Sequence, residues 1–138
     1  MKHVPRIAIL AAVLTAGHGT QANATMQHID DGAPYTHKAY RQFVDTDSIK
    51  SQGNGRVLAI VFSSFYEPQV TDDGATKYDR AMAYELFDCP SRSYTVNRGF
   101  YMLHGKIISD TGLMYPPFLP AVKGTIAEET LDFVCSRI

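Results

Sequence analysis

Two cysteines, Cys89 and Cys135, constrain this chain more than any other feature of its sequence, because neither has any other cysteine to pair with. An isolated pair in an oxidising compartment most simply forms one disulfide. The alternatives are two reactive thiols or two metal ligands. However, the CxxC spacing is absent, and two thiolates alone make a poor zinc site. The sequence therefore predicts a disulfide that holds two distant segments together.

The N-terminal residues indicate that the chain reaches such a compartment. Lys2 and Arg6 form a positive region, residues 7–17 are an apolar run, and residues 22–24 (Ala-Asn-Ala) fit the small-x-small cleavage rule. This pattern predicts a signal peptide over residues 1–24. The alternative, a membrane anchor, is disfavoured because the apolar run is much shorter than the ~20 residues that span a bilayer. With no cysteine after the run to carry a lipid, we expect an exported protein without a lipid anchor. It would be periplasmic, secreted or on the outer-membrane surface.

The size and charge of the chain exclude several classes of protein. It has 138 residues, 45% of them hydrophobic and 20% charged, with a net charge of −1. That is enough for one domain and too apolar for a wholly disordered chain. It also lacks the basic excess of a nucleic-acid binder. We predict a flexible leader at residues 25–37, which are polar and rich in turn formers, and one domain over residues 38–138.

The middle of the domain has the alternation and the β-branched and aromatic residues that are typical of strands. Residues 78–88 are balanced between helix and strand by composition and period. Their position between strand-like segments and the following Cys89-Pro90 stop favour a strand. The remaining strands are predicted at residues 39–45, 56–66, 93–97, 99–104 and 106–109.

The C-terminal residues change to a helical period. Thr125 and Glu128 have the spacing of a capping box. An apolar stripe follows at helical spacing, and it includes Cys135. The predicted disulfide would therefore tie the buried face of this helix to the end of a strand. The predicted fold class is α+β: a single antiparallel β-sheet of about five or six strands with a C-terminal helix disulfide-tethered to one face.

Several short segments, taken in order, resemble the surface-adhesin protein E family of exported bacterial proteins over about residues 38–137. They are residues 45–49 (DTDSI), 84–89 (YELFDC), 92–94 (RSY), 124–125 (GT) and 133–135 (FVC). The resemblance implies a sheet with the helix tethered to its concave side, and a strand at residues 78–88. It also implies a non-enzymatic binding module that contacts host matrix proteins or acidic glycans. The alternative is a periplasmic envelope-associated factor on the same fold.

No motif indicates catalysis, a cofactor or a metal. The histidines after the signal peptide lack ligand spacing, and no nucleophile elbow or phosphate-binding loop occurs. The carboxylate pairs Asp45/Asp47 and Glu85/Asp88 are explained as exposed strand ends and turn starts. We therefore predict no catalytic, cofactor-binding or metal-binding residues.

One stretch is a candidate partner-binding surface, because basic and aromatic side chains are interleaved along it. Ordinary sheet surface is the simpler interpretation, and a basic-aromatic face for acidic partners is the functional one. Exposed sheet edges also favour a homodimer. The candidate partner-binding residues are Arg92, Tyr94, Arg98, Tyr101 and Lys106.

Overall fold

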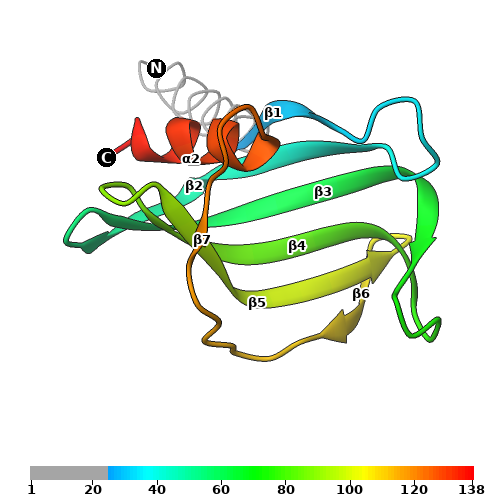
Figure 1. Ribbon diagram of the computed structural model, residues 1–138. Coiled ribbons are helices and arrows are strands. Elements are labelled where there is room, and N and C mark those ends of the chain that lie inside the picture. Colours follow the sequence, from blue (N-terminus) through cyan, green and yellow to red (C-terminus); the bar gives the residue numbers. More distant parts are fainter. Residues whose placement is uncertain (1–24) are drawn as a thin grey trace, which may run out of the picture.

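The computed structural model of this chain describes residues 25–138, so the predicted signal peptide at residues 1–24 lies outside the described part. Within these described residues, seven strands and one helix follow one another (Figure 1). The strands are β1 (Met26–Gly32), β2 (Tyr40–Gly53), β3 (Arg56–Val70), β4 (Lys77–Asp88), β5 (Ser93–Leu103), β6 (Lys106–Asp110) and β7 (Leu119–Pro120). The helix is α2 (Ile126–Cys135).

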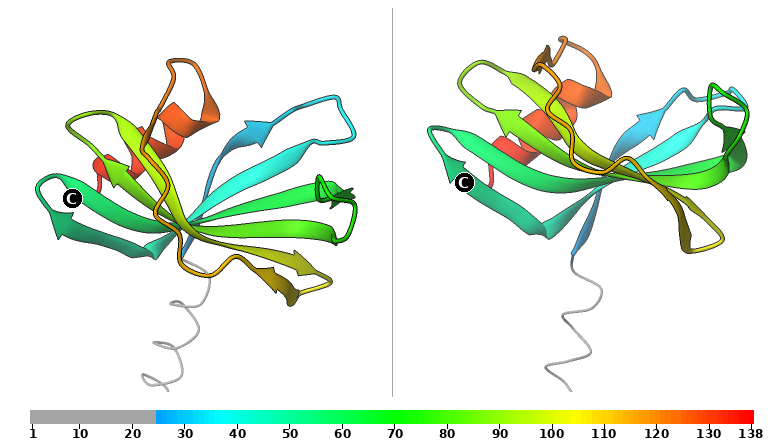
Figure 2. Two further views of the ribbon diagram at one scale, coloured as in Figure 1. Left: turned by 60° about the horizontal axis from the view of Figure 1, so that its bottom comes forward. Right: turned by 90° about the horizontal axis from the view of Figure 1, so that it is seen from below.

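The strands form one antiparallel sheet in the order β1-β2-β3-β4-β5-β6, so each strand pairs with its neighbour in sequence. The short strand β7 also pairs with β5, opposite Ser93 and Tyr94. The sheet is curved, and α2 lies over its concave side (Figure 2). The predicted α+β fold, with a C-terminal helix on one face of an antiparallel sheet, is confirmed. None of the helices in residues 25–138 is both long and apolar enough to cross a membrane.

Some element boundaries differ from the sequence-based expectations. Residues 78–88 do form a strand, β4, whereas the two segments predicted at 93–97 and 99–104 are one strand, β5. Residues 26–32, expected in a flexible leader, form β1 along the edge of β2. Most side chains of β1 are exposed. Their pairing therefore rests largely on backbone hydrogen bonds, which the polar composition does not reveal.

The core lies between the helix-side face of the sheet and the apolar stripe of α2. Alternation along β3 places Val57, Ala59 and Val61 on this face, and each is less than 5% exposed. Leu131 and Val134 of α2 complete the core and are fully buried. The helical spacing of these two residues brings both onto the sheet.

The start of α2 has the predicted cap. The Thr125 hydroxyl accepts a hydrogen bond from the Glu128 backbone N–H (3.4 Å), and the Glu128 carboxylate accepts one from the Gly124 N–H (3.2 Å). The hydroxyl and the carboxylate thus satisfy backbone donors that a bare helix start would leave unpaired.

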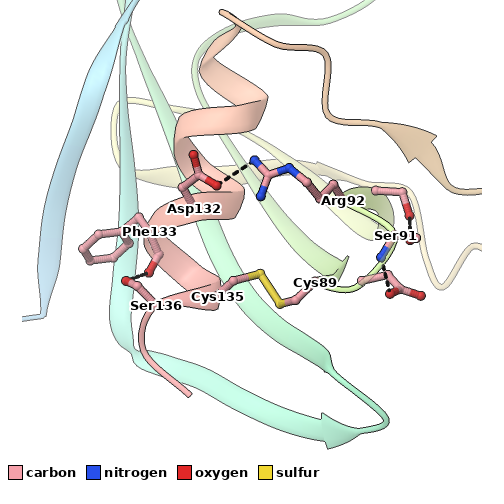
Figure 3. Close-up of a disulfide and its surroundings, with 9 residues drawn as sticks. Cys89, Ser91, Arg92, Asp132, Phe133, Cys135 and Ser136 are labelled. Atoms are coloured by element: carbon pink, nitrogen blue, oxygen red, sulfur yellow. Dashed lines mark hydrogen bonds and ion pairs between the residues drawn. A yellow bond between two sulfur atoms is a disulfide. The ribbon is translucent and has the colours of Figure 1, made fainter.

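The other end of α2 is held by the Cys89–Cys135 disulfide, with the two Cα atoms 5.9 Å apart (Figure 3). Cys89 directly follows β4, and Cys135 is the last residue of α2. The predicted pairing, and its role in tethering the helix to the sheet, are confirmed.

Candidate functional site

The first of the predicted partner-binding residues, Arg92, contacts the helix. It lies in the β4–β5 turn, where its guanidinium is 2.7 Å from the Asp132 carboxylate (Figure 3). The Glu128 carboxylate is 3.5 Å away. The hydrogen bond to Asp132, together with the negative charges of Asp132 and Glu128, raises the pKa of Arg92. The charge of Arg92 is therefore largely balanced within the chain.

Arg98 points to the sheet face away from the helix. Its guanidinium is 2.6 Å from the Asp110 carboxylate of β6 and stacks over the Phe100 ring, 4.9 Å from its centroid. The hydrogen bonds from Arg98 and from the Gly112 N–H lower the pKa of Asp110 to about 2. Arg98, like Arg92, has a carboxylate partner.

Tyr94 and Tyr101 lie on the helix-side face, and Lys106 is an exposed residue at the start of β6. An extra residue in β5 causes this division. Val96 pairs with Glu85 and Arg98 with Tyr84, so Asn97 forms a bulge that reverses the alternation beyond it. The structure therefore does not bring the five predicted residues onto one surface. Binding through them remains a prediction.

The face away from the helix carries a row of large apolar side chains across four strands. Phe43 pairs with Phe62, Phe62 with Met82, and Met82 with Phe100. Of these, Phe43, Phe62 and Met82 are only half-buried. No described helix or strand covers this face (Figure 2). We call these four residues the outer apolar row.

Two shallow hollows adjoin this row. One, of about 260 Å³, is lined by Met26, Phe43, Phe62, Ser64 and Arg80. The other, of about 320 Å³, is lined by Leu58, Ile60 and Tyr84 together with polar residues of β2, namely Asp45, Asp47, Ser48 and Lys50. The outer face thus combines exposed apolar side chains with a recessed surface, as protein-binding faces often do.

The helix-side face is only partly covered by α2. Its uncovered floor consists of small side chains, Ser63, Ala81 and Ala83, which are all half-exposed. Beyond them runs a chain of aromatic rings. Neighbouring centroids are 5.4 Å apart for Tyr40–Phe65, 5.5 Å for Phe65–Tyr78 and 4.4 Å for Tyr78–Tyr101.

Glu85 is the acidic residue beside this floor, and sequence reasoning assigned it to an exposed strand end. Instead it is half-buried within β4, three residues before the last residue of the strand, opposite Ala59 of β3 and Val96 of β5. Burial raises the pKa of Glu85 to about 7. The signal was present in the sequence, because Glu85 alternates in phase with Ala83 and Phe87. Asp88, which the sequence analysis considered together with Glu85, forms an ion pair with Arg56 at 3.3 Å.

Within residues 25–138, no group of three or more His, Cys, Asp or Glu side chains could hold a metal ion. Two of the described histidines, His28 and His104, have a carboxylate nearby. His28 lies 2.9 Å from the Asp31 carboxylate, and His104 lies 3.8 Å from that of Asp79.

Comparison with models of known protein families assigns the chain to a family. The model of the surface-adhesin protein E family matches residues 31–136, almost the whole described domain. This chain belongs to the surface-adhesin protein E family. The resemblance seen in the sequence is thus confirmed. No curated protein and no solved structure matches the chain.

Proposed function

We propose that this member of the surface-adhesin protein E family is an exported, non-enzymatic binding module that contacts a host matrix protein through its outer face. The outer apolar row carries the proposal, because aromatic and Met side chains left half-exposed in the middle of a sheet favour a protein partner. An acidic glycan is the weaker candidate, since Arg92 and Arg98 each have a carboxylate partner in the chain.

Localisation is the first test. Protease treatment of intact cells should remove the protein if it reaches the surface, where a host matrix protein could meet it. Protection until the outer membrane is opened would contradict the adhesive role. It would favour the alternative, a periplasmic envelope-associated factor.

Binding is the second test. Purified protein would be applied to immobilised fibronectin, laminin and collagen, and the dissociation constant would be measured for each protein that retains it. Replacing Phe43 and Phe62 together by Thr should weaken that binding at least tenfold. The control is Tyr115→Thr, which removes an aromatic ring that is 86% exposed in the loop between β6 and β7. An equal effect of the control, or no effect of the double variant, would contradict the assignment of the outer face.

A second copy of the chain is the competing occupant of the same face, because a homodimer could bury the outer apolar row against itself. Light scattering of the wild type and of the Phe43→Thr/Phe62→Thr variant separates these cases. A dimer that the double variant converts to a monomer would assign the row to self-association.

The basic residues require a separate experiment. If Arg92 and Arg98 bind acidic glycans, reversing both to Glu should abolish salt-dependent retention on a heparin column. Lys38→Glu, on an exposed loop residue, controls for net charge. Unchanged elution of the double variant would contradict a role for these arginines.

A further inference from the structure

Glu85 is an acidic side chain for which the described part of the chain provides no partner. No hydrogen bond or ion pair to its carboxylate forms within residues 25–138, whereas Asp88, Asp110 and Asp132 each have an arginine partner. Direct pairing with Ala59, which is fully buried in the core, fixes Glu85 on the helix-side face. The Glu85 oxygens reach solvent, because the described residues contain no buried side-chain oxygen without a hydrogen-bond partner. The carboxylate is therefore half-buried, accessible and free of a counter-ion within residues 25–138.

The surroundings of Glu85 are aromatic and uncharged. Tyr94 of β5 is its diagonal neighbour, because Tyr94 pairs with Phe87, two residues from Glu85 on the same face. Tyr40 of β2 is also within electrostatic range, and the Glu85 charge contributes to the raised pKa values of both phenols. The basic side chain at the nearby turn, Arg92, is already bound to acidic residues of α2.

Solvent reaches this part of the face. Ala81, Ala83 and Ser63 have short side chains that would be fully buried if α2 covered them, yet all are half-exposed. A ligand group can therefore lie on this floor next to the carboxylate without displacing the helix. The ring chain from Tyr40 to Tyr101 borders the same floor.

We propose that this uncovered floor binds an organic cation, an ammonium or guanidinium group, with Glu85 as its counter-ion and Tyr40 and Tyr94 beside it. A carboxylate with limited access to water attracts a cation more strongly than one in bulk solvent. Phenol rings add attraction through their electron-rich faces. A metal ion is a poorer occupant, because the described residues offer no three-ligand cluster.

The proposal does not depend on matrix binding by the outer face, because the two surfaces lie on opposite sides of the sheet. The cation could be a free polyamine or a Lys or Arg side chain of a partner. Both sources present the same chemistry, and the experiment must separate them.

The experiment measures binding by isothermal titration calorimetry with two probes, spermidine and an acetylated, amidated Lys/Arg peptide. Glu85→Gln keeps the size of the side chain and removes its charge, so it should weaken binding at least tenfold. Glu67→Gln removes an exposed carboxylate from β3 and should leave the dissociation constant unchanged. Binding of spermidine alone indicates a free polyamine, and binding of the peptide alone or more tightly indicates a partner side chain.

The pH dependence of probe binding gives a second readout that needs no variant. The ionisable groups near Glu85 are Tyr94 from β5 and Tyr40 from β2, since Ala59 of β3 and Val96 of β5 carry none. Asp30 of β1 also acts on Tyr40 and is hydrogen-bonded to Glu129 of α2. Neither tyrosine titrates below neutrality, because its pKa is raised. Binding should therefore weaken about tenfold or more between pH 8 and pH 5.5, as Glu85 becomes protonated. A bound cation should also lower the pKa of the Glu85 carboxyl, observed by carbon NMR.

Three results would overturn the proposal. One is that neither probe binds the wild type. Another is that Glu67→Gln weakens binding as much as Glu85→Gln, which would indicate general charge attraction. The third is that the Glu85 pKa stays constant at saturating probe.

Discussion

The Glu85 carboxyl makes the stability of this domain depend on pH. Burial raises its pKa from an ordinary value of 4.5 to about 7 in the folded protein. The folded state then binds a proton more tightly than the unfolded state. The contribution of this group to the unfolding free energy is therefore fully present below about pH 4.5, and it is lost as the pH rises through about 7.

Replacing Glu85 by Gln should remove this dependence. Relative to wild type, Glu85→Gln should gain on the order of 2 kcal/mol of unfolding free energy between pH 4.5 and pH 8. Urea unfolding at both pH values measures the difference, with Glu67→Gln as the control. The same offset between variant and wild type at both pH values would mean that Glu85 has an ordinary pKa in the folded protein.

Single residues also show which features of the candidate site could not be predicted from the sequence. The phase of Glu85 with Ala83 and Phe87 is visible in the sequence, but its burial depends on which face α2 covers. The separation of Arg98 from Tyr94 depends on the bulge at Asn97, and no residue type there signals it. The outer apolar row is likewise formed by pairing between strands that a single sequence does not specify.

At the scale of elements, α2 depends on its first turn. Replacing Thr125 by Ala removes the hydroxyl that accepts the Glu128 N–H, and it should lower the unfolding free energy by about 1 kcal/mol. Thr125→Ser keeps a hydroxyl at the cap and is the matched control. If urea unfolding gave the Thr125→Ala and Thr125→Ser variants the same unfolding free energy, the cap would contribute nothing measurable to stability.

The elements that could be predicted are those with strong local patterns. The capping box and stripe of α2 give a helix, and the apolar run in β3 gives a strand. β1 could not be predicted, because a polar segment becomes a strand only when an edge such as that of β2 offers hydrogen bonds. β7 is similar, a two-residue pairing in a Pro-rich segment that lies beside β5.

At the scale of the whole molecule, the disulfide joins the last turn of the helix to the end of β4. It closes a loop with a sequence separation of 46, for which the chain-entropy model gives about 4 kcal/mol of stabilisation. Reduction should therefore shift urea unfolding of the wild type to a lower midpoint. A Cys89→Ser/Cys135→Ser variant should resemble the reduced protein and should not respond to reductant. A reduced wild type as stable as the oxidised protein would contradict this role.

The overall architecture was predictable because export, the cysteine pair and the change from strand period to helical period all favour the same arrangement. The family resemblance implied a concave sheet, and what remained open was the fraction of the concave side that one short helix covers. That fraction depends on side-chain volumes across several strands at once, which no local pattern encodes.

The order of the strands has a consequence for how the chain folds. From β1 to β6 every strand pairs with its sequence neighbour, so the sheet can assemble through successive hairpins with short closing loops. The helix differs, because it packs against β1 from the opposite end of the described chain. Helix docking is thus expected to be a late, long-range step. A sheet without the docked helix would expose apolar side chains on both faces, and such a species would be prone to aggregate.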